Sequence, residues 1–478
     1  MADQLTALDA TFLELEEADL SAHMHIGAVM IFESSDAPTP AEVAADLEER
    51  LDALPRYRKR LSAQRTGGLS WPNWEDPPAF DLRSHVRRAG LPAPGGREEL
   101  RRWASEYFGE RLDRSRPLWE LVVVEGLEGG RWALVSKTHH CMVDGVGSVD
   151  ASTTLFDTEP HRRHPEAAEP VSPIPPPQLP EEGRSPLETV TGGIAGVARL
   201  PIAAGRAGIG AVGAGLGMVR HPGRGIDALK RSRALAELIV KDEINAAPHT
   251  SINVPIGAHR EIAVVTVPID DLKGIKNSLG GKLNDVVLSA SAGGLRELML
   301  SRGETPPESG LRAMVPVNVR SDSEHLALGN KISSLFVELP VAEADPLRRY
   351  QLQTAASRRH KRTGQATGSA AMIDFSSHAP PVVHSLLARS MYATRLFNLT
   401  ITNVPGPPSE LYAFGARVDE VWPLVPLAAE HAIGIAILSY AGKVCICLNV
   451  DPDAVPDLEV LRSGIEDAIG ELKDLAAV

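Results

Sequence analysis

Short apolar runs rich in Val and Ile recur in two separated parts of the chain, and they predict β-strands. In the first part these runs cover residues 26–32, 119–125 and 132–138. The last two flank a glycine-rich segment at residues 126–130, which indicates a hairpin. In the second part the predicted strands cover residues 262–268, 311–317, 433–438 and 444–448.

Helical patterns, with apolar side chains three or four residues apart, alternate with these strands. They predict helices at residues 40–54, 271–279, 284–300 and 458–475. Helices and strands are therefore mixed in both parts, and we expect an α/β fold with two halves of similar content.

A change in composition separates the two parts. Prolines cluster in residues 159–186, where they favour a stiff, extended linker. Residues 194–219 are rich in Gly and Ala, which is typical either of a packed interdomain helix or of a segment near lipid. We therefore expect an N-terminal half at residues 1–158, a connecting segment at 159–250 and a C-terminal half at 251–478.

The composition is that of an acidic globular protein. The 478 residues carry 49 basic and 62 acidic side chains, a net charge of −13, so we expect no nucleic-acid partner. Three cysteines exclude a disulfide framework, and the spacing of Cys445 and Cys447 predicts core positions on a strand. We find neither a secretory signal nor an uncharged run of the ~20 residues that a membrane span needs, so we expect a cytoplasmic protein.

The stretch from His139 and His140 to Asp144 and Gly145 carries the strongest chemical indication. Adjacent side chains on an extended segment point to opposite faces, so one histidine faces a cavity and the other packs behind it. A metal site is disfavoured, because neighbouring histidines do not easily converge on one ion. The other interpretations are histidines without chemistry, and a general base whose neutral imidazole takes a proton from a hydroxyl.

HHxxxDG at residues 139–145 resembles the signature of the CoA-dependent acyltransferase superfamily, which includes chloramphenicol acetyltransferase and the condensation domains of peptide synthetases. Further motifs narrow the resemblance to the bacterial wax ester synthase/diacylglycerol acyltransferase family. They follow one another across nearly the whole chain and are Leu8-Asp9 with Phe12-Leu13 and Glu16, Met24-His25-Ile26-Gly27, Arg116-Pro117-Leu118-Trp119, Asn284-Asp285, Pro316-Val317-Asn318-Val319-Arg320, Gly329-Asn330 and Thr402-Asn403-Val404-Pro405-Gly406-Pro407.

This resemblance implies two chloramphenicol-acetyltransferase-like halves, each with a mixed sheet, and an active-site tunnel between them. His140 would face the middle of the tunnel and act as the general base. Acyl-CoA would be a substrate, and the resemblance implies neither a cofactor nor a metal ion. Matching positions that would support the site are His139, Gly145 and Trp119, and those that would bind substrate or CoA are Asp285, Thr402 and Asn403.

Four further positions have interpretations of their own. Asn284 would donate to the oxyanion of the reaction, but an asparagine here is equally typical of a helix N-cap. Asp144, counted with His140 and Asn284 in the catalytic set, would pair with Arg320 and fix the histidine loop. Arg320 is otherwise a solvated arginine at a strand end. Glu16 either matches an acid of the family or lies on a solvated helix face.

The implied reaction moves a long-chain acyl group from acyl-CoA to diacylglycerol, giving triacylglycerol, or to a long-chain fatty alcohol, giving a wax ester. Two alternatives are another lipid or polyketide-like alcohol as acceptor, and a non-catalytic lipid-droplet binding protein. Because the substrates are apolar, we expect peripheral contact with a membrane or lipid droplet. Arg199, Arg206, Arg220 and Arg224 would approach anionic head groups, at ~1 kcal/mol each.

Overall fold

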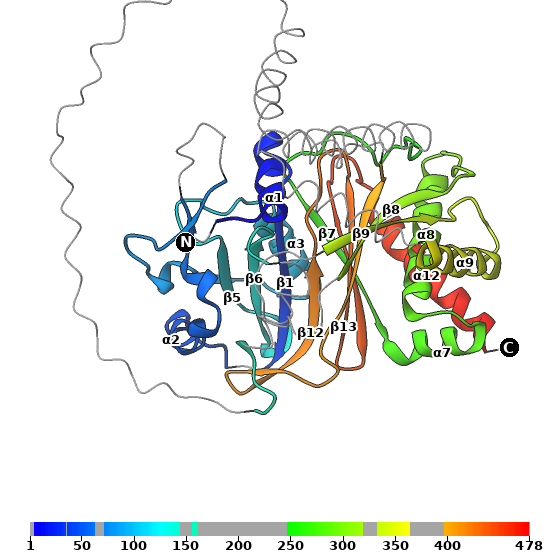
Figure 1. Cartoon of the computed structure of the whole chain (residues 1–478). Coiled ribbons are helices and arrows are strands. Elements are labelled where there is room, and N and C mark those ends of the chain that lie inside the picture. Colours follow the sequence, from blue (N-terminus) through cyan, green and yellow to red (C-terminus); the bar gives the residue numbers. More distant parts are fainter. Residues whose placement is uncertain are drawn as a thin grey trace, which may run out of the picture. The chain divides into compact units, whose positions relative to one another are not determined.

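The computed structural model describes residues 4–34, 36–62, 71–143, 155–160, 246–318, 332–363 and 396–477. The chain divides into one compact unit formed by Met1–Pro165 with Ala246–Val478, and a second unit formed by Glu166–Asn245. All described residues belong to the first unit, whose helices and strands are labelled in Figure 1. In this part of the chain, no helix has both the length and the apolar character that crossing a bilayer requires.

The first sheet has six strands in the order β11-β12-β1-β6-β5-β4. Their bounds are β1 (His25–Glu33), β4 (Val86–Gly90), β5 (Trp119–Glu125), β6 (Trp132–His139), β11 (Tyr412–Ala413) and β12 (Ala416–Leu424). β5 and β6 pair antiparallel, which confirms the predicted hairpin, and β4 pairs parallel to β5. In the hairpin connection, Gly126 and Gly129 have φ of 80° and 75°, a conformation that glycine adopts without strain.

Two strands of this sheet come from the far end of the sequence. β12 pairs antiparallel with β1, from Gly27 opposite Leu424 to Glu33 opposite Arg417. Figure 1 shows the orange β12 beside the blue β1. The sequence does not predict this exchange, and the half boundary at residue 251 stays a prediction.

Three helices and several short elements accompany the first sheet. The helices are α1 (Ala7–Ala18), α2 (Pro40–Arg50) and α3 (Arg97–Phe108). The short elements are the 3₁₀ turns η1 (Leu51–Ala53), η2 (Pro55–Arg58), η3 (Leu82–Ser84) and η4 (Glu128–Gly130), and the paired strands β2 (Arg60–Leu61) and β3 (Trp74–Glu75). Thr39 and Glu42 form a capping box around Pro40, and η1 continues the helix, so the helix predicted at residues 40–54 is confirmed.

The second sheet has six strands in the order β7-β14-β13-β10-β8-β9. Their bounds are β7 (Glu261–Pro268), β8 (Leu311–Asn318), β9 (Ile332–Leu339), β10 (Leu399–Pro405), β13 (Ile433–Tyr440) and β14 (Lys443–Val450). β10 runs parallel to β8 and β13, and the other pairs are antiparallel, so this sheet is also mixed. The associated helices are α7 (Ile269–Leu279), α8 (Leu283–Ser301), α9 (Pro346–Thr363) and α12 (Leu458–Ala476). Every helix and strand predicted for this half is confirmed.

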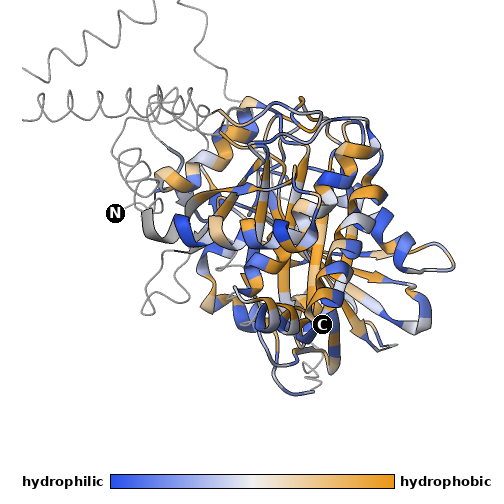
Figure 2. Ribbon diagram, turned by 90° about the vertical axis from the view of Figure 1, so that its right-hand side faces the viewer, coloured by the Kyte–Doolittle hydropathy of each residue, from blue (hydrophilic) through white to orange (hydrophobic). Residues whose placement is uncertain are grey.

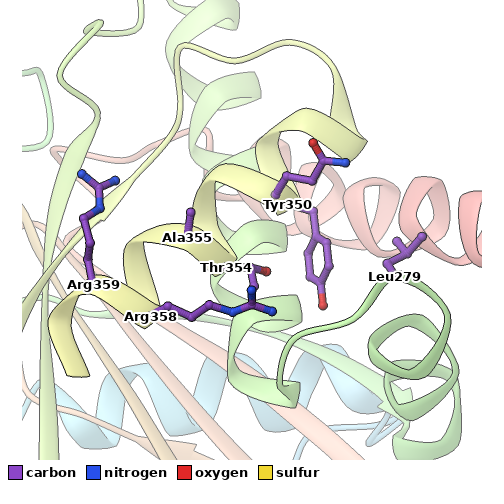
Figure 3. A pocket seen from close by; sticks show the side chains of 7 residues that line it. Leu279, Tyr350, Thr354, Ala355, Arg358 and Arg359 are labelled. Atoms are coloured by element: carbon purple, nitrogen blue, oxygen red, sulfur yellow. The ribbon is translucent and has the colours of Figure 1, made fainter. Parts of the chain in front are cut away.

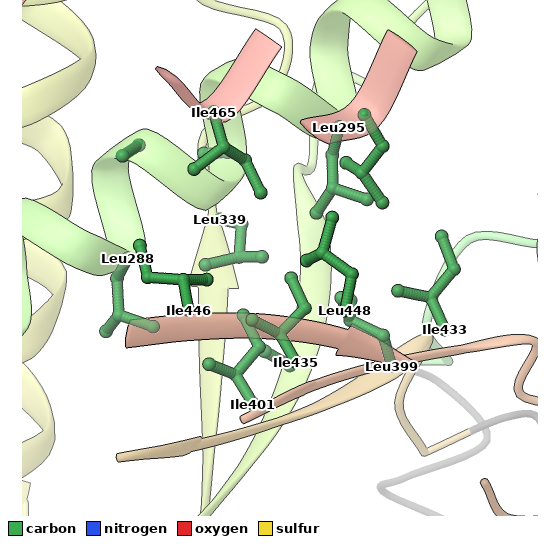
Figure 4. Packing of buried hydrophobic residues seen from close by; sticks show 14 of the residues in the cluster. Leu288, Leu295, Leu339, Leu399, Ile401, Ile433, Ile435, Ile446, Leu448 and Ile465 are labelled. Carbon is green, nitrogen blue, oxygen red and sulfur yellow. The ribbon is translucent and has the colours of Figure 1, made fainter. Parts of the chain in front are cut away.

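The main core lies between the second sheet and the helices α8 and α12, as Figure 4 shows. The two helices approach closely because of a glycine: a Cβ atom at Gly294 would lie 2.5 Å from Cγ1 of Ile465. Each fully buried Leu or Ile side chain contributes about 1.5–3 kcal/mol to folding. Figure 2 shows the apolar residues concentrated along the strands.

The opposite face of the second sheet packs against the first half. Cys445 and Cys447 are buried there in a cluster that also contains Trp422 of β12 and Leu100 of α3. This confirms the predicted core role of the two cysteines. Arg97 of α3 also pairs with Glu420 of β12 at 2.6 Å.

Candidate functional site

His139 and His140 lie at the end of β6 and are held there by backbone hydrogen bonds. The N–H of His139 donates to the carbonyl of Leu118 at 2.9 Å, and the N–H of His140 donates to the carbonyl of Met24 at 2.8 Å. The His139 side chain is only 1% exposed, whereas that of His140 is partly exposed. The two rings therefore have different environments, as the alternation along an extended segment requires.

The ring of His140 stacks on the ring of Phe12 in α1, with centroids 3.9 Å apart and planes at 7°. Phe12 and Met24 are buried in the apolar cluster that is built mostly from the second half, including Val286 and Leu288 of α8. The partly exposed imidazole thus lies where the N-terminal elements meet the core of the second half.

The neighbouring His139 is locked in one tautomer. The backbone N–H of Cys141 donates to Nδ1 of His139 at 3.1 Å, so Nδ1 carries no proton. The ring proton is therefore on Nε2, which donates to Oε2 of Glu16 at 3.1 Å. Both ring nitrogens are engaged in the interior, and His139 cannot serve as the base for a substrate.

Glu16 is a buried carboxylate, 1% exposed, that holds this part of the site together. Besides His139, it accepts the N–H of Met24 at 3.2 Å and a guanidinium N–H of Arg111 at 2.7 Å. Burial raises the pKa of Glu16, but the hydrogen bonds that the carboxylate accepts from His139 and Arg111 outweigh this and hold the pKa well below its usual value. The interpretation of Glu16 as a solvated residue is wrong.

Two further buried histidines, His23 and His25, lie beside this carboxylate. The sequence indicates no chemical role for either of them. His25 is opposite His139 in the β1–β6 pair, and its Nε2 lies 3.8 Å from Glu16. Burial lowers the pKa of His25 well below 6.5. Burial and the charge of Arg260 lower the pKa of His23 to about 4. Both imidazoles are therefore neutral at pH 7.

Trp119 lies in the core of the first half, 2% exposed. Its Nε1–H donates to the carbonyl of Tyr57 at 2.7 Å, and its ring stacks on His85 at 4.5 Å. It is also paired with Thr138, one residue before His139. These contacts are structural, and a role of Trp119 in supporting the site stays a prediction.

Asn284 and Asp285 begin α8, and Asn403 lies on β10. The N-cap of α8 is Lys282, so the alternative that Asn284 caps the helix is wrong. Asp285 accepts the N–H of Lys282 at 2.9 Å and closes the first turn. Nδ2 of Asn403 donates to Oδ1 of Asn284 at 2.9 Å, which ties the start of α8 to β10, the strand that also carries Thr402. The side-chain N–H groups of Asn284 are left to donate elsewhere.

Several predicted site features fall outside the described residues: Asp144, Gly145, Arg320 and the segment 194–219. The tunnel also stays a prediction. Two cavities of the described part of the chain have no contribution from His140: one lies along α9, and a narrow one lies beside Trp119. In this part of the chain, no hydrogen bond joins Asn284 to His140.

The chain matches two family models, a wax ester synthase/diacylglycerol acyltransferase catalytic domain at residues 5–287 and a WS/DGAT C-terminal domain at residues 328–473. Two curated relatives are from Mycobacterium tuberculosis. The probable diacylglycerol O-acyltransferase tgs1 is 31% identical, and the match covers 98% of this chain and 96% of the relative. The probable diacylglycerol O-acyltransferase tgs2 is 30% identical over 100% of both chains.

Two solved structures share the fold. The wax ester synthase/diacylglycerol acyltransferase from Marinobacter aquaeolei VT8 has a TM-score of 0.68 at 22% identity, covering 99% of this chain and 100% of that chain. The starter condensation domain of rhizomide synthetase has a TM-score of 0.60 at 15% identity. The match covers 100% of this chain and 95% of that chain. These likenesses confirm the predicted α/β fold of chloramphenicol-acetyltransferase type.

Proposed function

Because the chain belongs to the wax ester synthase/diacylglycerol acyltransferase family, we propose that His140 is the general base of its acyl transfer. The chain is an O-acyltransferase whose acceptor is a diacylglycerol or a long-chain alcohol. The observation that supports His140 most is its partly exposed ring, stacked on Phe12 beside the core of the second half. His139, in contrast, uses both ring nitrogens inside the protein.

The reaction is a direct transfer without a covalent acyl-enzyme. His140 takes the proton of the acceptor hydroxyl as the oxygen attacks the thioester carbonyl of acyl-CoA. The tetrahedral intermediate then expels the CoA thiolate, which recovers the proton from the imidazolium of His140, so charge and protons balance. A positioned base of this kind contributes about 10²–10⁴-fold to the rate. No cofactor takes part, and acyl-CoA is consumed as a substrate.

Asn284 donates a side-chain N–H to the oxyanion of this intermediate. Its oxygen already accepts from Asn403, which fixes the orientation of the amide. It also lies in the first turn of α8, at the positive end of the helix dipole. A preorganised donor stabilises the transition state more than the ground state, because the charge develops on the oxygen only during the reaction.

Replacement of Asn284 by alanine should lower kcat by about a hundredfold, the lower part of the range for removal of one oxyanion donor. The melting temperature should change little, because Asp285 keeps the first turn of α8 closed. Steady-state kinetics with a saturating acceptor measure this effect. Asn277→Ala, at an exposed position on α7, is the matched control and should retain full kcat. Unchanged kcat in Asn284→Ala would contradict the assignment.

The acceptor is identified by incubating the purified protein with palmitoyl-CoA and either dioleoylglycerol or hexadecanol. Free CoA, detected with a thiol reagent, and the lipid product should form with at least one acceptor, and EDTA should not slow the reaction. If free CoA is released with only one of the two acceptors, that acceptor is the substrate. A folded protein that releases no CoA with either acceptor would instead favour the non-catalytic lipid-binding function.

We also propose that the enzyme reaches its apolar substrates by peripheral contact with a membrane or lipid droplet. The support is in the sequence, where Arg199, Arg206, Arg220 and Arg224 accompany the apolar segment 194–219. Arginines near an anionic surface contribute about 1 kcal/mol each to binding. Deletion of residues 190–222 should therefore reduce flotation with anionic liposomes. Equal flotation of the full-length and shortened chains would rule this segment out as the contact.

A further inference from the structure

Helix α9 concentrates positive charge in an otherwise acidic protein. Its sequence, Pro-Leu-Arg-Arg-Tyr-Gln-Leu-Gln-Thr-Ala-Ala-Ser-Arg-Arg-His-Lys-Arg-Thr, holds six Arg and Lys residues and no Asp or Glu, whereas the whole chain has a net charge of −13. Such a run is usually only a solvated face. In α9, however, two of these residues, Arg358 and Arg359, line a cavity.

The cavity has a volume of about 460 Å³, within the usual range for small-molecule sites. Its walls are Leu279, at the end of α7, and the face of α9 from Tyr350 to Arg359 (Figure 3). This lining combines apolar groups, the hydroxyls of Tyr350 and Thr354, and two guanidinium groups. The guanidinium groups suit the phosphate groups of a ligand, and the apolar groups suit its less polar part.

Arg358 lines the cavity and has no ion pair with another described residue. Its side chain is exposed and extends past Thr354 toward Tyr350 in Figure 3. Among the described residues, no carboxylate lies within ion-pairing distance of it. Arg349, on the buried side of the same helix, is instead occupied by Glu471 at 3.2 Å and by backbone carbonyls. Arg358 is therefore available to pair with an anion in the cavity.

The cavity is linked to the proposed oxyanion donor by a short segment, Gly280 to Lys282. The hydroxyl of Tyr350 donates to the carbonyl of Gly280. Gly281 has φ of 95°, and a Cβ atom there would lie 2.8 Å from Oη of Tyr350 and 3.2 Å from Oγ1 of Thr354. The segment thus borders the cavity and leads into the first turn of α8.

The electrostatics at this end of α8 favour an anion. Lys282, next to Gly281 in the chain, is exposed and is the N-cap of α8, where the helix dipole has its positive end. Asp285, an acid in the first turn of α8, is 3% exposed and accepts the N–H of Lys282.

We infer that this cavity binds the phosphate-bearing nucleotide end of acyl-CoA, with Arg358 pairing with a phosphate. The inference rests on the proposed function, in which acyl-CoA is the donor. Acyl-CoA carries its phosphates on an adenosine at one end and its thioester at the other, joined by a long flexible arm. Arginine pairs with phosphate through two parallel charge-assisted hydrogen bonds. With the nucleotide beside α9, the arm passes Gly281 and carries the thioester toward Asn284.

The test compares Arg358→Ala with Arg348→Ala. Arg348 is also exposed on α9 but does not line the cavity, so the control removes the same charge from the same helix. Arg358→Ala should raise KM for palmitoyl-CoA roughly tenfold or more, with kcat nearly unchanged. Adenosine 3′,5′-bisphosphate should bind the wild type and Arg348→Ala, and it should bind Arg358→Ala at least tenfold more weakly in titration calorimetry. Equal effects of both substitutions, or none, would overturn the inference.

A second variant, Ala355→Trp, tests whether the ligand occupies the cavity. Ala355 is exposed and lines the cavity, so the indole fills the cavity without disturbing the core. It should weaken binding of the bisphosphate by a similar factor at an unchanged melting temperature, and full-strength binding would overturn the inference.

Because calorimetry needs no turnover, it reports on this site even if the proposed reaction fails. If Arg358→Ala loses flotation with phosphatidylglycerol vesicles but keeps its affinity for the bisphosphate, the anion is a lipid head group and the inference is wrong.

Discussion

His140→Ala should lower the rate of acyl transfer by about 10²–10⁴-fold, the contribution of a positioned general base. The loss should appear in kcat, because the base acts in the transition state. The fold should tolerate the change. The backbone N–H of His140 still donates to Met24, and the stacking on Phe12 that the ring loses is a contact of about 0.5–1.5 kcal/mol. Free CoA release measures the loss of rate, and thermal melting of the same preparation checks that the fold is retained.

The matched control for this substitution is His249→Ala, at an exposed histidine before β7. It should keep wild-type activity. If His140→Ala retained most of its activity, the base assignment would be refuted. A large fall in melting temperature would mean instead that the ring supports the fold.

Glu16→Ala should destabilise the protein by roughly 1–3 kcal/mol for each buried donor that loses its acceptor. The substitution leaves the Nε2–H of His139, the N–H of Met24 and the guanidinium of Arg111 without their shared acceptor. Activity should fall with stability, because His139 precedes His140 on the same strand end. Urea unfolding followed by tryptophan fluorescence measures the free energy of unfolding. The exposed neighbour Glu17 offers the control Glu17→Ala, which should cost less than 1 kcal/mol.

The same cluster predicts how stability depends on pH. The folded-state pKa of Glu16 is below its ordinary value of 4.5, so its stabilisation is present above that value and is lost as the pH falls. Burial lowers the pKa of His23 from 6.5 to about 4, so the unfolded chain binds the extra proton first, and stability also falls between these two values. Unfolding free energies measured from pH 7 to pH 4 should therefore decline. Glu16→Gln should flatten the curve below about pH 4.5, and a curve parallel to that of the wild type would contradict the role of Glu16.

The fold was predictable where local patterns determine it. β5, β6 and β14 are buried runs rich in β-branched residues, and each was found from sequence alone. Helix α9 was missed because basic and polar residues dominate it, so its apolar stripe is too narrow to recognise. β12 shows regular alternation of buried and half-buried residues, but its partner β1 lies nearly four hundred residues earlier, and no local pattern encodes that pairing.

The site was predictable only in part, for related reasons. The opposite environments of His139 and His140 follow from the geometry of an extended segment. Glu16 could not be resolved, because Glu14 and Glu17 lie on the same helical turn, and only tertiary contacts with Arg111 and His139 show which acid is buried. The two interpretations of Asn284 could not be separated from sequence, because asparagine favours N-cap positions in general, whereas in α8 Lys282 is the N-cap and Asp285 the capping acid.

The passage of β11 and β12 into the first sheet means that the chain crosses between the two sheets twice more, after β10 and before β13. The backbone ladder between β1 and β12, seven residue pairs from Gly27 to Glu33, therefore depends on a segment that follows most of the second half in the sequence. A fragment that stopped at residue 287 would leave the edge of β1 unpaired and prone to pairing with other chains.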